Sequence, residues 1–263
     1  MPVLELKYKK LEGIIKRQGS AVVAFSGGVD SSVLAAVAFR ILGNKVAAIT
    51  LDSPAIPRSE LTEARKIARF IGIRHVVLKH DELENKNFAR NGRQRCYYCK
   101  RMLSQVLRKH ALKTGFYGVL EGTNASELKG HRPGYRALKE KGVVSPLAVA
   151  GLTKEEVRLL AKKLRLPSYN KPSMACLSSR IPYGKKITLK ALRSVEKAEA
   201  YLKWLGVGQA RVRCFEDIAV LEVLPRDFRK VIKHREKISE GFRKIGFMRV
   251  ALDLQGYRTG SMN

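Results

Sequence analysis

Residues 21–32, AVVAFSGGVDSS, combine the residue types that can hold a phosphate group. An apolar run at the start of this stretch predicts a strand. Gly27 and Gly28 then allow a sharp turn and a close approach of the backbone to an anion. A helix that opens at Ser31 presents amide groups that favour negative charge. Asp30 stands inside this loop, and its carboxylate would repel phosphate unless a cation such as Mg²⁺ lay between them. We therefore predict ATP contacts, and a magnesium ligand at the aspartate, along one stretch: Ser26, Gly27, Gly28, Val29, Asp30, Ser31 and Ser32.

The Ser-Gly-Gly-Val-Asp-Ser sequence of residues 26–31 resembles the pyrophosphate loop of the ATP pyrophosphatase superfamily. It lacks the Lys-Ser or Lys-Thr ending of the other common phosphate loop. The resemblance implies an enzyme that cleaves ATP between the α- and β-phosphates, adenylates a carbonyl or carboxyl oxygen and releases pyrophosphate. NAD, GMP and asparagine synthetases and tRNA thiolases share such a loop, so the substrate stays open at this point. A glycine-rich turn without a ligand is the alternative.

Two further stretches follow predicted strands and are expected at the same edge of the sheet. Thr50 and Ser53 end an apolar run, and the superfamily resemblance implies that the backbone here holds adenine. Gly122 and Thr123 belong to a Glu-Gly-Thr-Asn-Ala turn at 121–125, which offers backbone and side-chain donors. Ligands of doubly wound sheets bind beyond the carboxyl ends of the strands, so we predict ATP contacts in both stretches. Ordinary loops at strand ends are the alternative.

The cysteines provide a second kind of chemistry. Cys96 and Cys99 have C-x-x-C spacing, and two nearby thiolates can bind zinc or an iron–sulfur cluster. Two reduced thiols in a loop before a helix are the alternative. Cys176 lies in a proline-containing loop, 172–184, beside serine and arginine residues, which suits an exposed loop that faces an anion. Cys214 lies on a predicted strand, and we expect it in the core because free cysteine is usually buried.

The motif Pro-Ser-x-Ala-Cys-Leu-x-Ser-Arg-x-Pro-Tyr-Gly at residues 172–184 resembles the signature of the LarE family. Further motifs match the same family: Gly122–Ala125 followed by Arg132–Gly134, Arg211–Arg213, and Gly256–Ser261. Together these matches cover nearly the whole chain. The chain departs from the family at Ser126-Glu127, where acids are common, and at Gly130-His131, where an acidic-aromatic pair is frequent.

The LarE resemblance implies an ATP-dependent sulfur transferase that builds the nickel-pincer nucleotide cofactor. A carboxylate of pyridinium-3,5-biscarboxylic acid mononucleotide is adenylated, and sulfur then replaces oxygen. Cys96, Cys99 and Cys176 match family members in which three cysteines hold a [4Fe-4S] cluster that carries sulfide. In other members the cysteine that matches Cys176 is sacrificed as the sulfur donor. The resemblance therefore implies catalytic roles for Cys176 and Asp30 and leaves both routes of sulfur transfer open.

Four residues are predicted to bind the substrate. Arg211 and Arg213 alternate along a predicted strand, so both side chains point to one face. Two guanidinium groups on one face suit a phosphate or carboxylate, and the resemblance implies contact with the substrate phosphate. It implies substrate contacts for Ser179 and Arg180 as well. A solvated basic strand face is the alternative for the two strand arginines.

The chain of 263 residues carries 52 Lys and Arg against 23 Asp and Glu, a formal net charge of +29. Such a charge is expected of a nucleic-acid-binding protein, of an enzyme whose field steers an anionic nucleotide, or of a chain with a basic solvated surface. A tRNA thiolase is therefore the enzymatic alternative, with tRNA as partner. A non-catalytic nucleotide- or RNA-binding module is the alternative of another class. The sequence shows neither flanking zinc ribbons nor a separate RNA module, which favours a small nucleotide substrate together with a sulfide source.

Alternating strand and helix patterns indicate an α/β fold, a doubly wound and mostly parallel sheet of the adenine nucleotide alpha hydrolase type, over residues 1–183. The pattern changes afterwards, and residues 184–263 are predicted to form a small α+β domain. The expected strands are 22–25, 46–51, 76–78, 117–120, 210–214, 219–223 and 248–252. The expected helices are 4–16, 31–42, 59–71, 100–113, 154–164, 189–205 and 226–238. Ser59 and Thr153 are predicted as helix caps, the latter in a capping box with Glu156.

No apolar run of the sequence approaches the length of a membrane span, and the N-terminal stretch reads as an amphipathic helix without the apolar core of a signal peptide. We therefore expect a cytoplasmic protein with reduced cysteines that does not bind a membrane. The LarE resemblance implies a homo-oligomer, a hexamer.

Overall fold

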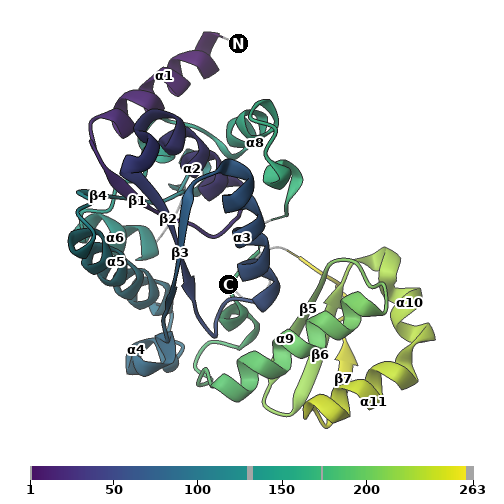
Figure 1. Cartoon of the computed structure of the whole chain (residues 1–263). Coiled ribbons are helices and arrows are strands. Elements are labelled where there is room, and N and C mark those ends of the chain that lie inside the picture. Colours follow the sequence, from purple (N-terminus) through teal and green to yellow (C-terminus); the bar gives the residue numbers. More distant parts are fainter. Residues whose placement is uncertain (1, 129–132, 173, 259–263) are drawn as a thin grey trace. The chain divides into compact units, whose positions relative to one another are not determined.

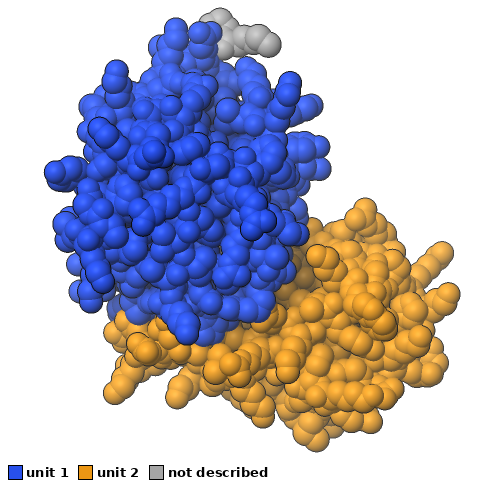
Figure 2. Space-filling model, in the orientation of Figure 1, with its two compact units in different colours: residues 1–80, 96–174 blue, residues 81–95, 175–263 orange. Residues whose placement is uncertain are grey.

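The computed structural model describes residues 2–128, 133–172 and 174–258 (Figure 1). The chain divides into two compact units (Figure 2). Unit 1 consists of residues 1–80 and 96–174, and unit 2 consists of residues 81–95 and 175–263. The short stretch before the C-x-x-C motif therefore folds with the C-terminal part of the chain. The predicted domain boundary at residue 183 stays a prediction.

Unit 1 is built around a parallel four-stranded sheet in the order β3-β2-β1-β4. The strands are β1 (Ala21–Ala24), β2 (Val46–Asp52), β3 (Arg74–Lys79) and β4 (Gly118–Leu120). β1 lies between two neighbours, because Val22 pairs in register with Ala47 on one side and with Val119 on the other. The apolar runs of β1 and β2 are buried, as strands covered on both faces require. The predicted α/β class is confirmed.

Helices cover both faces of this sheet (Figure 1). They are α1 (Pro2–Lys16), α2 (Val29–Leu42), α3 (Arg58–Ile71), α5 (Arg95–Lys113), α6 (Pro133–Glu140), α7 (Pro146–Val149) and α8 (Lys154–Lys163). Val23 packs in a core with Leu11 of α1 and Leu34 of α2, whereas Val22 packs in a second core with Leu107 of α5. Successive residues of one short strand thus organise opposite layers. Within the described ranges, no helix is long and apolar enough to cross a membrane.

Unit 2 contains the second, smaller sheet. Its elements are α4 (Lys86–Ala89), α9 (Leu189–Trp204), β5 (Ala210–Phe215), β6 (Ile218–Val223), α10 (Phe228–Lys233), α11 (Arg235–Ile245) and β7 (Arg249–Leu252). β5 pairs antiparallel to β6, and β7 pairs parallel to β6. α9 packs against β5 and α11. The 81–95 stretch is tied to this unit by the Ile187 N–H, which donates to the Ala89 carbonyl at 2.8 Å.

Two helices begin earlier than predicted, and this changes the setting of functional residues. α2 begins at Val29 after the N-cap Gly28, so Asp30 lies in the first helical turn. α5 begins at Arg95 instead of residue 100, so the C-x-x-C motif lies inside a helix and not before one. Apolar periodicity does not mark these starts, because the first turns face a loop or solvent.

Two predictions about helix ends are wrong and one is confirmed. Ser59 lies inside the first turn of α3 and does not cap it, because the N-cap is the preceding proline, whose side chain makes no capping hydrogen bond. The helix predicted over 226–238 is two helices, α10 and α11, which meet at His234. The capping box of α8 is confirmed: Thr153 accepts from the Glu156 N–H at 3.3 Å, and Glu156 accepts from the Thr153 N–H at 2.8 Å.

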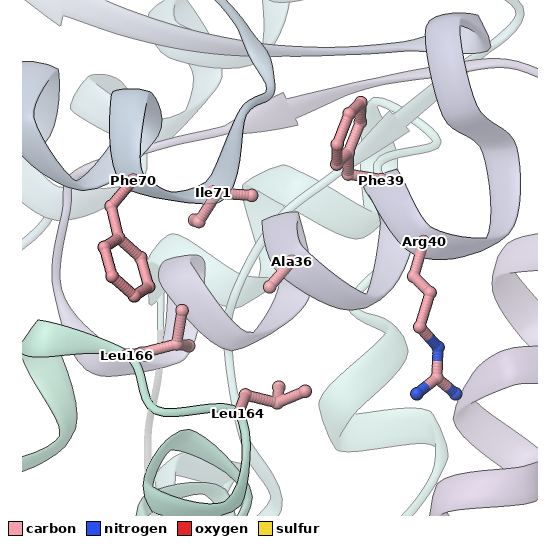
Figure 3. Close-up of a pocket in the computed structure, with 7 residues that line it drawn as sticks. All are labelled: Ala36, Phe39, Arg40, Phe70, Ile71, Leu164 and Leu166. Atoms are coloured by element: carbon pink, nitrogen blue, oxygen red, sulfur yellow. The ribbon is translucent and has the colours of Figure 1, made fainter.

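A shallow apolar hollow of about 350 Å³ lies between α2, α3 and the segment after α8 (Figure 3). Its lining residues are Ala36, Phe39, Arg40, Phe70, Ile71, Leu164 and Leu166. The charged side chain among them, Arg40, is paired with Glu12. A polyphosphate needs several donors, so this apolar hollow does not suit the nucleotide. The carboxyl end of the sheet offers the better setting.

Candidate active site

The loop between β1 and α2 has the geometry of a phosphate cradle. Gly27 has a φ of 69°, and a Cβ atom there would lie 2.8 Å from the Cα atom of Ala64, so only glycine fits without strain. Serine hydroxyls close the turn: the Ser26 N–H donates to Ser31 Oγ at 3.2 Å, and the Gly28 N–H donates to Ser26 Oγ at 3.3 Å. The N-cap of α2 is Gly28, which has no side chain to cap the helix. The first-turn amides are therefore left to bind an anion.

Ser32 supports the same interpretation. Its side chain is fully buried, and its hydroxyl has no hydrogen-bond partner among the described residues. Buried hydroxyl groups are normally paired, so an unpaired one in the first turns behind the cradle fits a site that takes a polar ligand. Val29, also predicted to contact ATP, packs its side chain in the core and leaves only its backbone for a ligand.

The turn after β4 lies directly against the cradle. A Cβ atom at Gly122 would lie 3.0 Å from the backbone nitrogen of Ser31, so the two loops are in contact. Asn124 is fully buried and donates through Nδ2 to Asp30 Oδ1 at 3.0 Å. The structure therefore brings together two stretches that the sequence analysis placed at the same edge of the sheet.

Glu121 is a buried carboxylate that shapes this turn. It accepts the Thr123 N–H at 3.1 Å, the Thr123 hydroxyl at 2.8 Å, and the hydroxyl of Ser145. The Thr123 side chain is thus engaged within the protein, and its predicted contact with ATP stays a proposal. Glu121 was not predicted as a functional residue, although an acid at the end of a buried strand is an unusual residue that could have drawn attention.

Asp30 is held by a cation that the sequence analysis missed. Lys154 Nζ forms an ion pair with Asp30 Oδ2, and the two side chains are 25% and 19% exposed. Lys154 is the first residue of α8, placed there by the capping box at Thr153. A signal was present in the sequence, because a lysine at the positive end of a helix opposes the helix dipole and calls for an acidic partner. The site thus accommodates a cation beside the Asp30 carboxylate.

The predicted adenine contacts at the end of β2 have engaged side chains. The Thr50 hydroxyl donates to the Phe25 carbonyl at 2.7 Å and lies 2.8 Å from His75 Nε2. Burial, followed by the charge of Arg65, lowers the pKa of His75. The Ser53 hydroxyl accepts a backbone N–H two residues further on at 3.1 Å. Any adenine contact in this stretch is therefore left to the backbone, as the superfamily resemblance implies.

The C-x-x-C thiols lie three residues apart near the start of α5, and therefore on the same side of the helix. Cys96 is exposed and Cys99 is half-buried. Cys176 is also exposed, at the N-cap of the short turn Leu177–Arg180. Among the described residues, no three His, Cys, Asp or Glu side chains lie close enough to hold a metal ion. The chemistry of three accessible thiols nevertheless fits an iron–sulfur cluster.

Two buried side chains hold the loop that follows Cys176. Asn91 is fully buried with a φ of 57°, and its Nδ2 donates to three backbone carbonyls within residues 181–185 at 2.7 to 3.1 Å. Arg95, the residue before the C-x-x-C motif, donates to the Ser178 carbonyl at 2.9 Å and to Asn91 Oδ1 at 2.6 Å. The irregular backbone around Cys176 therefore has defined hydrogen-bond partners inside unit 2.

Arg213 is not the solvated side chain that the alternative interpretation expected. It is 6% exposed and forms a bidentate ion pair with Glu222, with both N–O distances at 2.7 Å. It also donates to the Ser179 carbonyl at 2.7 Å. Much of its guanidinium group is thus engaged by the protein, and the strand that carries it is joined to the Cys176 loop.

Arg211 is equally buried, at 7% exposed, but is differently partnered. It donates to the Ala210 carbonyl at 3.0 Å and lies over the Tyr257 ring, 5.4 Å from the centroid. Within the part of the chain that the structure describes, it forms no ion pair with a carboxylate. Burial, and next the charge of Arg180, lower the pKa of Arg211. A buried guanidinium without its own carboxylate is well suited to an anionic ligand.

Arg180 is fully buried, and its guanidinium group is used inside the protein. It pairs with Glu199 through Nε at 2.9 Å and through a terminal nitrogen at 3.0 Å. The other terminal nitrogen donates to the carbonyls of Ala175 and Cys176 at 2.7 and 3.0 Å. This geometry brings Arg180 to the predicted site, but with its donors facing the protein.

Some residues of the predicted motifs lie outside the described residues. These are Gly130, His131 and Arg132 of the segment after β4, Ser173 of the loop before Cys176, and Thr259, Gly260 and Ser261 near the end of the chain. Their predicted roles stay predictions.

A glycine-rich loop from the first strand of a parallel sheet to a helix, with an aspartate in the first turn, defines the class to which this protein belongs. Residues 4–190 match the model of the NAD synthase family, and the chain belongs to this family of PP-loop proteins. Shorter similarities extend to glutamine-hydrolyzing GMP synthases: one such protein from Methanococcus maripaludis is 32% identical over 160 residues, 56% of this chain and 50% of that protein.

Similarity over the full length narrows the assignment. The pyridinium-3,5-bisthiocarboxylic acid mononucleotide synthase of Lactiplantibacillus plantarum is 33% identical over 264 residues, 100% of this chain and 96% of that enzyme. This relation shows that the chain belongs to the LarE family. Two uncharacterized proteins are similar over comparable lengths. One, from Synechocystis, is 40% identical over 99% of this chain and 98% of its own, and one from Methanocaldococcus jannaschii is 31% identical over 90% of each.

Proposed function

We propose that this protein is an ATP-dependent sulfur transferase that adenylates a carboxylate of pyridinium-3,5-biscarboxylic acid mononucleotide, releases pyrophosphate and inserts sulfur. The full-length similarity to the synthase of Lactiplantibacillus plantarum supports the substrate class. The observation that carries the reaction class is the position of Asp30, an acid at the mouth of an anion cradle, paired with Lys154 and bonded to Asn124.

ATP would be held by the amides of Ser26–Ser32, which are fixed in place before the reaction. Such preorganised donors stabilise the charge that develops on a departing pyrophosphate. Asp30, oriented by the Asn124 amide, would hold Mg²⁺, which neutralises charge on the phosphates when it is bound. Lys154 adds a second positive charge beside the same carboxylate. The first half-reaction therefore depends on residues of the cradle and the two loops that touch it.

The mononucleotide substrate would be anchored by Arg211 in unit 2. Its buried guanidinium group lacks an ion pair within the described residues, and a phosphate would supply the missing negative charge. Arg213 and Ser179 complete the predicted anchor, with Arg213 oriented by Glu222.

Cys96, Cys99 and Cys176 would hold a [4Fe-4S] cluster, which supplies an open iron for sulfide when it is bound. The presence of the C-x-x-C pair supports this route, because a sacrificial mechanism needs only Cys176. Sacrifice of the Cys176 sulfur remains the competing route. We further propose a homo-hexamer and an external sulfide source, in keeping with the family resemblance.

The test is an anaerobic assay of pyrophosphate release with ATP, magnesium, sulfide and the biscarboxylic acid mononucleotide, followed by mass spectrometry of the nucleotide product. Replacement of an oxygen by sulfur in that product is expected. Pyrophosphate release that depends on tRNA instead, together with filter binding of tRNA, would favour the thiolase alternative that the charge of +29 leaves open. Absence of both activities in a protein that binds ATP would favour the non-catalytic module.

A further inference from the structure

Arg180 lies at the centre of a buried hydrogen-bond network around the Cys176 loop. Its side chain is 0% exposed. One terminal nitrogen donates to the Ala175 carbonyl at 2.7 Å, to the Cys176 carbonyl at 3.0 Å and to the Ser179 hydroxyl at 3.0 Å. The same group therefore fixes the peptide on both sides of the cysteine. These carbonyls belong to irregular backbone, which has no helix or sheet ladder of its own to satisfy them.

The other edge of the guanidinium group is bound by Glu199 of α9. Glu199 Oε1 accepts from Arg180 Nε at 2.9 Å and also from the Val212 N–H of β5 at 3.1 Å. Glu199 Oε2 accepts from Arg180 at 3.0 Å. One carboxylate therefore joins the Cys176 loop to the residue that lies between Arg211 and Arg213. A fork of two parallel charge-assisted bonds fixes direction as well as distance.

A second connection joins the same two elements. Arg213 donates to the Ser179 carbonyl at 2.7 Å while Glu222 holds its guanidinium group in place. The Ser179 N–H in turn donates to the Cys176 carbonyl at 3.0 Å. The loop is thus tied to β5 at two points, through Arg180 with Glu199 and through Arg213 with Glu222.

We propose that Arg180 is not a substrate ligand but a positioning residue, which through Glu199 holds the Cys176 loop at a fixed place relative to the strand that carries Arg211 and Arg213. This proposal rests on the proposed function for the chemistry that it serves. The sulfur-handling cysteine and the anchor of the substrate phosphate would then keep a constant separation. Small errors in such a separation are costly, because a displacement of about 1 Å at a reacting centre lowers the rate about 100-fold.

Two substitutions test the proposal on the full-length protein. Arg180→Lys keeps the positive charge but lacks the planar fork, so it cannot bind Glu199 and the two loop carbonyls together. Glu199→Gln keeps the shape of the partner but replaces one acceptor oxygen by a donor. Arg193→Lys is the matched control, because Arg193 is exposed on the same helix as Glu199.

Hydrogen–deuterium exchange of the backbone amides at residues 177–181 gives the readout that does not depend on activity. Both variants should exchange these amides at least about tenfold faster than wild type, whereas the amides of Ser26–Ser32 and the Arg193→Lys protein stay unchanged. In the sulfur-transfer assay, kcat should fall about 100-fold while the KM for the mononucleotide stays within about twofold.

Unchanged exchange at residues 177–181 in Arg180→Lys, together with a raised KM, would overturn the proposal and return Arg180 to the substrate ligands. If Arg180→Lys does not fold, as judged by circular dichroism, the Glu199→Gln protein decides the question by the same measurement. If wild-type protein does not convert the mononucleotide at all, the proposed function fails, while the exchange data still decide whether Arg180 holds the loop.

Discussion

Lys154 Nζ and Asp30 Oδ2 form an ion pair that joins the first turn of α8 to the first turn of α2, across 124 residues of sequence. Asp30 belongs to the phosphate loop, and Lys154 is placed by the capping box at Thr153. The ammonium group therefore stands where a carboxylate, a metal ion and a polyphosphate are expected to meet. Because both side chains are mostly buried, their interaction is screened less than a surface pair.

We expect Lys154→Met to lower the rate of pyrophosphate release about 100-fold, since the site loses a preorganised positive charge beside the leaving group. Asp30→Asn should lower it at least as much, because the predicted magnesium ligand is lost. The double variant should be no slower than the slower single variant, since residues that act as a unit are not additive.

The control for this prediction is Lys163→Met, which removes an exposed lysine from the same helix and should leave the rate unchanged. Wild-type pyrophosphate release from a folded Lys154→Met protein would show that the ion pair only supports the fold.

The phosphate loop could be predicted because its chemistry is local. The glycines, serines and the aspartate follow one another in sequence, and their backbone conformation depends on a few neighbouring residues. Lys154 could not be assigned to Asp30 in this way, because the pairing depends on how α8 packs against α2. The α/β class was accessible for the same local reason, through apolar runs separated by amphipathic helices.

The arginines of unit 2 show where residue type misleads. A basic strand face looks solvated in a chain with a net charge of +29, yet Arg211 and Arg213 are buried. Their burial depends on Glu199 and Glu222, which come from a helix and a neighbouring strand. Sequence position alone does not reveal these partners. Likewise, the sequence placed Arg180 among the substrate ligands, whereas its donors face the protein.

Gly27→Ala should destabilise the protein and abolish ATP binding. The added Cβ atom would lie 2.8 Å from the Ala64 Cα atom, in addition to the strain of a φ of 69°. We expect a loss of about 3 kcal/mol in the free energy of unfolding, measured by denaturant titration.

Gly19→Ala separates the two causes, because Gly19 has a φ of 66° but, among the described residues, no atom within 4 Å of an added Cβ. That variant should lose only about 1 kcal/mol and should bind ATP normally. Equal losses of stability in the two variants would show that the close approach to α3 is not what requires glycine at position 27.

Arg211 and Arg213 should respond in opposite ways to replacement by methionine. Arg211→Met removes a buried charge that has no ion pair among the described residues, so the free energy of unfolding should rise by about 1 kcal/mol. Affinity for the mononucleotide should fall about 10- to 100-fold, because a charge-assisted contact is lost. Calorimetric titration with substrate and, separately, with ATP would show whether ATP affinity is retained.

Arg213→Met leaves Glu222 as a buried carboxylate without its bidentate partner. It should therefore destabilise the protein by about 3 kcal/mol, in contrast to the Arg211 variant. A destabilised Arg211→Met protein with unchanged substrate affinity would mean that Arg211 supports the fold and does not anchor the phosphate.

The cysteines distinguish the two routes of sulfur transfer. If Cys96, Cys99 and Cys176 hold a cluster, three thiolates occupy three irons and leave the fourth open. Protein purified without oxygen should then be brown, and each of the variants Cys96→Ala, Cys99→Ala and Cys176→Ala should be colourless. Cys214→Ala is the matched control: its thiol is buried on β5, burial raises its pKa, and it donates to the Glu216 carbonyl at 3.5 Å. That variant should keep the colour.

Mass spectrometry of wild-type protein after turnover with sulfide provides the second measurement. A cluster that carries sulfide leaves Cys176 chemically intact, so the mass of the protein should not change and the enzyme should turn over repeatedly. Transfer of the Cys176 sulfur itself would break its Cβ–S bond and leave dehydroalanine, with the loss of the mass of H₂S and a single turnover. Dehydroalanine at position 176 in reconstituted protein supplied with sulfide would therefore contradict the cluster route. It would also leave Cys96 and Cys99 without a role in the transfer, since one sacrificed sulfur requires only one thiol.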